Sequence, residues 1–326
     1  MAIVSAISSL SVTESRSKAN VYNEYNTLKE VLLGTANMLY FPQSHDIEKE
    51  ENATGISKFL SRRIYPMFSG KKVPNWIAKK FRKEEETLLK ILIDHGVKVH
   101  RPNDVVPLPD EPIGLGQMFS RDPIITVGNT ILNSQLQIPM RRKENRGFDS
   151  LLQKLSSNGV QVEKHRELNT FLEGGDVIVN YPYIFVGQSK YGSNQNGIDW
   201  LKKIVGDSFE IIPVIITDPS VLHLDCAMTI IGNNKGIIHR KSLQAELPKP
   251  LSDYDFIEVD DKTAKQLGTN VLVINPQTVV VQKRHKKLIK SLSENGYKVI
   301  PICFTWHTLL GGAFRCATSP INRSHE

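Results

Sequence analysis

The sequence VIVNYPYIFVG, residues 177–187, places apolar runs on both sides of Tyr181-Pro182 and predicts a β-hairpin that turns there. A helix is predicted over residues 198–205. It ends at Gly206, because glycine readily adopts the left-handed conformation that closes many helices. Residues 209–212 then predict a further strand. This part of the chain therefore predicts a unit made of a hairpin, a helix and a strand.

The same unit recurs along the chain. Further hairpins are predicted at 124–132, 228–239 and 271–281, helices at 84–95, 148–157 and 285–294, and strands after them at 97–100, 160–162, 256–259 and 298–300. With a strand at 30–34 counted as the start of the first unit, the chain holds five copies, spaced roughly 50 to 60 residues apart.

Repeated units that cannot bury their own apolar face must pack on one another, and five copies without clear caps favour closure into a ring. The predicted fold class is therefore α/β, a five-bladed pseudosymmetric propeller. A doubly wound sheet is the alternative. It usually carries one strand per helix, whereas this chain alternates hairpin and helix.

The start of the chain is expected to be less ordered than the rest. Residues 1–20 are rich in serine and are predicted to be disordered, whereas 21–326 are predicted to form a single catalytic domain. Residues 35–80 show little periodicity and are expected to form a surface excursion or a lid. The start of the chain resembles neither a signal peptide nor a membrane span, so a cytoplasmic protein without a membrane partner is expected.

The composition limits the kinds of partner and cofactor that the protein is expected to bind. The chain has 326 residues and a formal net charge of +7, but its basic runs are not interleaved with aromatic residues, so solvated faces are expected rather than a nucleic-acid site. Its three cysteines are too widely spaced to indicate a disulfide framework or a zinc site. No cofactor and no metal are expected. Whether the protein forms a homo-oligomer is left open.

Polar residues gather where one unit joins the next. Asp122 precedes one hairpin, Glu173 and Asp176 precede the next, and His223 and Asp225 precede the one after. In a ring, such joints converge on one axis. Cys316 follows Gly311-Gly312 beyond the last predicted strand, and Arg315 beside it would favour the thiolate. The sequence therefore predicts a site that contains several carboxylates, one histidine and one thiol.

Such a site suits a guanidinium, a cation that takes planar bidentate hydrogen bonds from carboxylates. A thiolate can attack the guanidinium carbon, and a histidine can protonate the departing amine. Each residue has an ordinary structural alternative: the acids as turn or cap residues, His223 as a half-buried histidine, and Cys316 as a buried structural cysteine. Cys226 and Cys303 lie in apolar stretches and are expected to be structural.

Four motifs occur in a fixed order: Arg-Asp-Pro at 121–123, Glu-Gly-Gly-Asp at 173–176, His-Leu-Asp at 223–225 and Gly-Gly-x-x-x-Cys at 311–316. From residue 23 to about 323 the chain resembles the guanidine-modifying superfamily, which comprises arginine deiminases, dimethylarginine dimethylaminohydrolases and amidinotransferases. The resemblance implies a five-bladed, pentein-like α/β propeller, in agreement with the five units.

The resemblance also implies roles for matching residues. Cys316 would be the nucleophile that forms a covalent thiouronium, His223 the general acid and then base, and Glu173 the acid that pairs with the histidine. The implied ligands of the substrate are Asp122, Asp225, Asp176 and, for a substrate carboxylate, Arg142 or its neighbour Arg141. The substrate would be a small arginine-like guanidino compound.

Superfamily members pass the amidino group either to water or to a second amine. Residues 22–25, 196–201 and 309–318 resemble amidinotransferases, whereas 173–176, 185–190 and 319–323 resemble hydrolases. Because the hydrolase-like stretches include the site, hydrolysis is the favoured interpretation. Transfer to an amine acceptor and a non-catalytic guanidinium-binding relative are the alternatives. The particular guanidino compound stays open.

Overall fold

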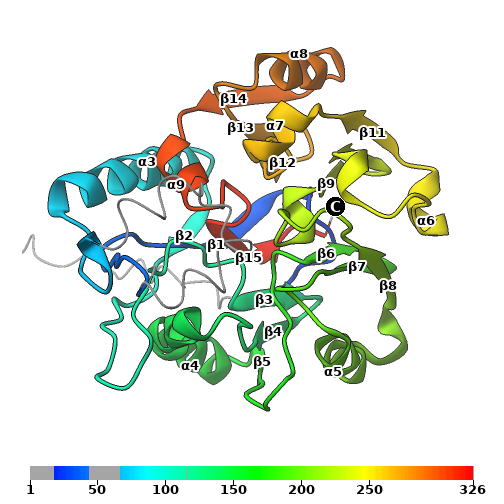
Figure 1. The fold of residues 1–326 in the computed structure, drawn as a ribbon. Helices are drawn as coiled ribbons and strands as arrows, with labels where there is room; N and C mark the ends of the chain where they lie inside the picture. Colours follow the sequence, from blue (N-terminus) through cyan, green and yellow to red (C-terminus); the bar gives the residue numbers. More distant parts are fainter. Residues whose placement is uncertain (1–17, 44–66, 115, 326) are drawn as a thin grey trace, which may run out of the picture.

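The computed structural model describes residues 18–43, 67–114 and 116–325. Its strands form five three-stranded sheets arranged in a ring (Figure 1). In each sheet the middle strand pairs antiparallel with one neighbour and parallel with the other. The predicted five-bladed α/β propeller is therefore confirmed, and the doubly wound alternative is wrong.

Four sheets follow the order of the chain, each as a hairpin and then a parallel third strand. Their strands are β3 (Ile124–Val127), β4 (Thr130–Asn133) and β5 (Gln161–Lys164); β6 (Val177–Asn180), β7 (Tyr183–Gln188) and β8 (Glu210–Ile215); β9 (Met228–Gly232), β10 (Lys235–Ile238) and β11 (Asp255–Glu258); and β12 (Leu272–Asn275), β13 (Thr278–Gln282) and β14 (Lys298–Ile302).

The fifth sheet joins the two ends of the described chain. Its middle strand β1 (Leu28–Leu33) pairs in parallel with β2 (Lys98–His100) and antiparallel with β15 (Thr318–Arg323). The prediction that Cys316 lies beyond the last strand is therefore wrong, since β15 begins two residues after it. Cys316 thus precedes the first strand of a hairpin-like pair, as the other predicted site residues do.

Helices connect the middle strand of each sheet to its third strand and lie on the outside of the ring (Figure 1). They are α3 (Asn75–Asp94), α4 (Asp149–Ser157), α5 (Gln195–Val205), α6 (Lys249–Ser252) and α8 (Lys286–Glu294). Short 3-10 helices adjoin three of them: η1 (Pro139–Phe148) precedes α4, η2 (Gly206–Ser208) follows α5, and η4 (Arg240–Ser242) precedes α6. Between sheets lie η3 (Leu224–Cys226), α7 (Asp261–Lys265) and α9 (Thr305–Leu309).

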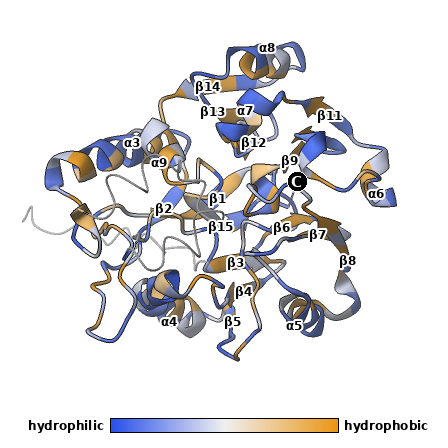
Figure 2. Cartoon of the chain, viewed as in Figure 1, coloured by the Kyte–Doolittle hydropathy of each residue, from blue (hydrophilic) through white to orange (hydrophobic). Residues whose placement is uncertain are grey.

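The apolar core lies between neighbouring sheets. Every residue of β6 and β9 is buried, whereas the third strand β8 has one buried residue, Val214, and its other residues are exposed or half-buried. Figure 2 shows the corresponding change from apolar strands near the axis to polar outer faces of the helices. The buried hairpin strands hold the joints between units at fixed positions near the axis.

Two predictions fall partly outside the described residues, namely the disordered start at 1–20 and the excursion at 35–80. Within the described part of that excursion, Tyr40 bridges to Lys72 and α3 already begins at Asn75. Among the helices that the structure describes, none has an apolar run long enough to cross a membrane.

Candidate active site

The joints that precede the hairpins meet at the axis through backbone hydrogen bonds. These run from Arg121 N to Cys316 O (3.1 Å), from Gly174 N to Asp122 O (3.1 Å) and from Asp225 N to Gly175 O (3.0 Å). The Thr269 hydroxyl continues the series by donating to Asp225 O at 3.1 Å. The converging polar stretches are therefore linked to one another, and their side chains form one site.

His223 lies between two carboxylates. Its Nε2 is 2.7 Å from Glu173 Oε2, and its Nδ1 is 3.5 Å from Asp122 Oδ1. One carboxylate oxygen from each acid and one ring nitrogen of His223 all lie within 4.8 Å of one another, and the three side chains are buried. The second Glu173 oxygen accepts a hydrogen bond from Gln137 N at 2.8 Å, which fixes the carboxylate towards the histidine.

This arrangement keeps His223 charged. Burial alone would lower the pKa of His223, but the neighbouring carboxylates, led by Asp122, outweigh it and raise that pKa well above its ordinary value. Burial would likewise raise the pKa of Asp122, yet His223 and then Arg141 hold it below its ordinary value. The imidazolium can therefore donate a proton to a leaving amine.

Two glycines allow close approach, Gly175 to the histidine ring and Gly174 to the Arg121 backbone. A Cβ on Gly175 would lie 2.6 Å from the His223 ring, and one on Gly174 would lie 2.0 Å from Arg121 O. Asp176 supports the same turn, because its carboxylate accepts hydrogen bonds from Ser193 N (2.7 Å) and Leu224 N (3.0 Å). Asp176 therefore fixes the backbone of the turn that the Glu-Gly-Gly-Asp motif forms. Burial raises the pKa of the Asp176 carboxyl group to about 7.

The Cys316 thiol is held by Asn270. Asn270 Nδ2 donates to Cys316 Sγ at 3.0 Å, and Asn270 Oδ1 accepts from the Cys316 backbone N–H at 3.1 Å. Asp225 Oδ2 lies 3.6 Å from the same sulfur and accepts a hydrogen bond from Arg315 at 2.9 Å. Arg315 also pairs with the buried Glu24 at 3.0 Å, so a chain of charges fixes Asp225 beside the thiol.

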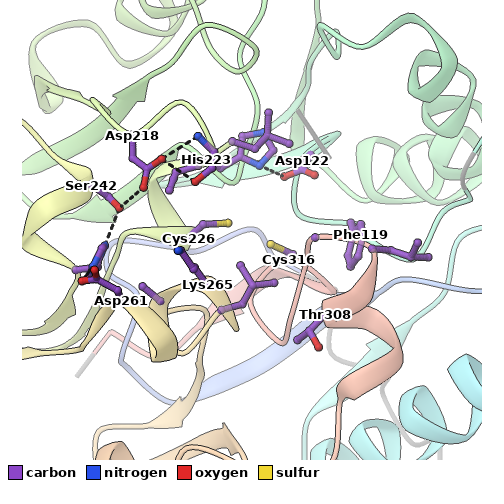
Figure 3. A pocket seen from close by; sticks show the side chains of 18 of the residues that line it. Phe119, Asp122, Asp218, His223, Cys226, Ser242, Asp261, Lys265, Thr308 and Cys316 are labelled. Atoms are coloured by element: carbon purple, nitrogen blue, oxygen red, sulfur yellow. Dashed lines mark hydrogen bonds and ion pairs between the residues drawn. The ribbon is translucent and has the colours of Figure 1, made fainter. Parts of the chain in front are cut away.

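A cavity of about 280 Å³ opens onto this site. Cys316, His223 and Asp122 line it, and Figure 3 shows the Cys316 and Cys226 sulfur atoms beside it. Glu173, Asp225 and Asp176 are buried and are not among the residues that line the cavity. Cys226, expected to be structural, also lines the cavity, whereas Cys303 is exposed. The cavity therefore presents a thiol, an imidazolium and a carboxylate to one ligand.

Arg142 is not among the residues that line the cavity. Its guanidinium donates to Leu136 O at 2.9 Å and Gln137 O at 3.0 Å and lies over the Phe171 ring. Its suggested role in binding a substrate carboxylate stays a prediction that this placement does not support. Its neighbour Arg141 lines the cavity and pairs with Asp122 at 2.8 Å.

One contributor, Asn270, was missed in the sequence, and another, Arg141, was not distinguished from its neighbour Arg142. Asn270 stands directly before the hairpin at β12, the same position in its unit that Asp122 and Cys316 occupy, so the repeat itself is the signal that points to it. Arg141 is buried and is also clamped by Glu144 at 3.0 Å. Adjacent arginines gave no sequence signal to distinguish the buried one.

A buried thiol, a charged histidine and carboxylates at the axis of a five-bladed α/β propeller are the features of the pentein superfamily. The chain is a cysteine-dependent guanidine-modifying enzyme of that superfamily, of the transferase or the hydrolase type. Within the superfamily, it belongs to the family described as N,N dimethylarginine dimethylhydrolase, eukaryotic, whose model matches residues 67–323.

Several relatives align with nearly the whole chain. An uncharacterized protein of Bacillus subtilis is 28% identical over 96% of this chain and 99% of its own length. The L-arginine:L-lysine amidinotransferase of Pseudomonas savastanoi is 23% identical over 93% of both chains.

Solved structures share the fold. An amidinotransferase of saxitoxin biosynthesis from Microseira wollei superposes with a TM-score of 0.82 at 22% identity, covering 94% of this chain and 98% of its own. The dimethylarginine dimethylaminohydrolase of Pseudomonas aeruginosa superposes with a TM-score of 0.66 at 15% identity, covering 90% and 99%.

Proposed function

We propose that the protein cleaves a guanidino C–N bond of an arginine-type substrate through Cys316 and transfers the amidino group to an amine acceptor. The observation that carries this proposal is the common cavity, which the Cys316 thiol, the His223 imidazolium and the Asp122 carboxylate all line. The cavity places a nucleophile, an acid and an anionic ligand around one guanidinium.

In the first step the guanidinium lies against Asp122, and the Cys316 thiolate attacks its central carbon. A C–S bond forms while the C–N bond to the departing amine breaks. The electron pair of that bond goes to the amine nitrogen, which takes the proton of His223. Asn270 stabilises the thiolate before attack by the hydrogen bond from Nδ2 to Sγ at 3.0 Å.

In the second step an acceptor amine takes the place of the first product. Neutral His223 removes a proton from the amine as its nitrogen attacks the amidino carbon. The C–S bond then breaks and its electron pair returns to Cys316. The products are a new guanidino compound and the starting enzyme, with His223 protonated again.

Support for an amine acceptor comes from the named relative, an L-arginine:L-lysine amidinotransferase that aligns over 93% of this chain. Apolar side chains, among them Phe119, Leu222 and Leu310, also line the cavity and suit the apolar part of an amine acceptor. The sequence-based preference for hydrolysis becomes the second candidate. The direct pairing of Glu173 with His223 and the family's hydrolase description favour that candidate.

The experiment is incubation with arginine labelled at the guanidino carbon, with and without lysine or glycine, followed by mass spectrometry. Transfer predicts that ornithine and a labelled amidino-acceptor form only when an amine is present. Labelled citrulline with ammonia, formed without an acceptor, would instead establish hydrolysis. Cys316→Ala should abolish both and remove the covalent adduct that a quenched wild-type reaction shows. An adduct that persists in this variant would refute the cysteine mechanism.

A further inference from the structure

The cavity extends beyond the groups that the reaction uses. In Figure 3 Asp122, Cys316 and Phe119 lie on one side of the cavity, and Asp218 and Ser242 lie on the opposite side. Neither of the two opposite residues lies near enough to the reacting thiol to form a hydrogen bond with it. They come from the segment after β8 and from η4, so a different part of the ring forms this wall.

Asp218 presents an oriented carboxylate on that wall. Its Oδ1 accepts hydrogen bonds from Ser220 N at 2.9 Å and Ser220 Oγ at 2.6 Å. Its Oδ2 accepts a longer one from Ser242 Oγ at 3.4 Å, and Ser242 is held in turn by His239 at 2.7 Å. Within the described residues no lysine or arginine forms an ion pair with Asp218, so its charge can bind a ligand.

Lys265 provides the opposite charge. It is the last residue of α7, lines the cavity and is drawn between Cys226 and the Asp261 wall in Figure 3. Across residues 18–43, 67–114 and 116–325, its ammonium makes neither an ion pair nor a hydrogen bond. Lys241, which lines the same cavity, pairs instead with Asp261 at 2.8 Å. Lys265 is therefore a cation in the cavity that a ligand's anion can reach.

We propose that Asp218 and Lys265 form the subsite for the amino-acid end of the substrate. The Asp218 carboxylate would accept hydrogen bonds from the α-ammonium group, and the Lys265 ammonium would donate to the α-carboxylate. Both residues line the same cavity, and an α-amino acid carries the two complementary charges on one carbon, so a single ligand could pair with both. This inference rests on the proposed function, since the same ligand must place its guanidinium beside Cys316.

The cavity walls between the Cys316 thiol and the proposed subsite suit an arginine-like ligand. Ile138, Val221 and Leu222 line the same cavity and can pack against the methylene groups that separate a guanidinium from an α-carbon. A decarboxylated guanidino compound would leave Lys265 without its anion, and a deaminated one would leave Asp218 without its cation. Lys265 and Asp218 therefore act as specificity-determining residues, each for one group of the substrate.

The test measures the KM of each of three guanidino compounds with the wild type and with each of two variants. Arginine, agmatine, which lacks the carboxylate, and 5-guanidinopentanoate, which lacks the amino group, are assayed on wild type, Asp218→Asn and Lys265→Gln. Loss of one charge-assisted hydrogen bond should raise the KM for arginine about 10-fold in each variant, with kcat within about twofold. Asp218→Asn should leave the KM for 5-guanidinopentanoate unchanged, and Lys265→Gln should leave that for agmatine unchanged.

Matched controls are Lys262→Gln on the same helix and the exposed Asp253→Asn, neither of which lines the cavity. Both should behave as wild type with every compound. A KM increase of equal size for all three compounds, or no increase for arginine, would overturn the subsite. So would a wild-type enzyme with the same KM for arginine and agmatine.

If the proposed function is wrong, the result differs from the one expected when only the subsite is wrong. If the wild type turns over none of the three compounds, calorimetry of arginine binding to Cys316→Ala still tests the subsite. Weakening of about 10-fold by the added Asp218→Asn or Lys265→Gln change supports it. Unchanged or undetectable arginine binding refutes it.

Discussion

The Asn270 side chain contacts Cys316 twice, accepting from its backbone N–H at 3.1 Å and donating to its sulfur at 3.0 Å. The two residues are separated by 46 positions in the sequence and lie at equivalent joints of neighbouring units. One amide therefore positions both the backbone and the sulfur of the nucleophile.

Asn270→Ala should lower kcat/KM about 10- to 100-fold, because a hydrogen bond to a charged sulfur is worth roughly 1.5–3 kcal/mol. Asn270→Asp keeps the acceptor for the backbone N–H but places a second acid beside the sulfur. It should slow the alkylation of Cys316 by iodoacetamide relative to the alanine variant. The exposed Asn233→Ala is the control. Alkylation profiles that match wild type in both variants would show that Asn270 only packs.

Glu173→Gln should reduce turnover roughly 10- to 100-fold by removing the charged partner of His223. Because Glu173 helps to raise the pKa of His223, the variant should also lose activity at a lower pH than wild type as pH increases. Steady-state rates across pH, with the exposed Glu167→Gln as control, check this. A rate within twofold of wild type and an unmoved alkaline limb would remove Glu173 from the mechanism.

Gly175→Ala should lower turnover about 100-fold, since its Cβ would lie 2.6 Å from the His223 ring and displace it. Gly296→Ala is a useful comparison, because Gly296 has a φ of 85° but nothing within 4 Å of an added Cβ. It should lower the melting temperature without changing kcat. Equal kcat for the two variants would show that the histidine tolerates the displacement.

Activity should not change when the protein is treated with a chelator, since the proposed reaction uses thiolate and imidazole. Among the described residues, two groups of side chains have metal-binding chemistry, Asp122–Glu173–His223 and Asp225–Cys226–Cys316, so the measurement is informative. Dialysis against a chelator followed by assay, with zinc or manganese added back, is sufficient. Activity lost on dialysis and regained with either ion would point to a metal-activated nucleophile.

His307 should make stability depend on pH. It is fully buried, with Nδ1 2.9 Å from Glu84 Oε2. Although burial opposes it, the hydrogen bonds to Glu84 and Glu85 raise the pKa of His307 above its ordinary value. Its contribution to stability is therefore complete below the unfolded pKa of about 6.5 and is lost as pH rises through the folded pKa.

Urea unfolding of wild type and His307→Gln at pH 6 and pH 9 measures this contribution. The stability advantage of wild type should be larger at the lower pH. The exposed His95→Gln should show no such difference. An advantage that is constant or grows with pH would mean that His307 is uncharged in the folded protein.

The local sequence pattern was sufficient to predict many of the structural elements of this protein and several of its candidate site residues. Alternating apolar residues, the turns and the helix-ending glycines predicted the hairpins and helices of the repeating unit, since these depend on neighbours within about ten residues. Their number implied the ring. The joints then pointed to Asp122, Glu173, His223 and Cys316, because a short polar segment between buried elements stands out in the sequence.

Contacts between distant segments were decided only by the tertiary structure. Strand β15 is a strand because β1, nearly 300 residues earlier, offers it a partner. Arg141 rather than Arg142 reaches Asp122 because successive residues of η1 point in different directions, which no local pattern records. Asn270 acquires its role only when the ring brings its joint beside that of Cys316. The sequence determined which units form, and the packing of units around the axis determined which side chains meet.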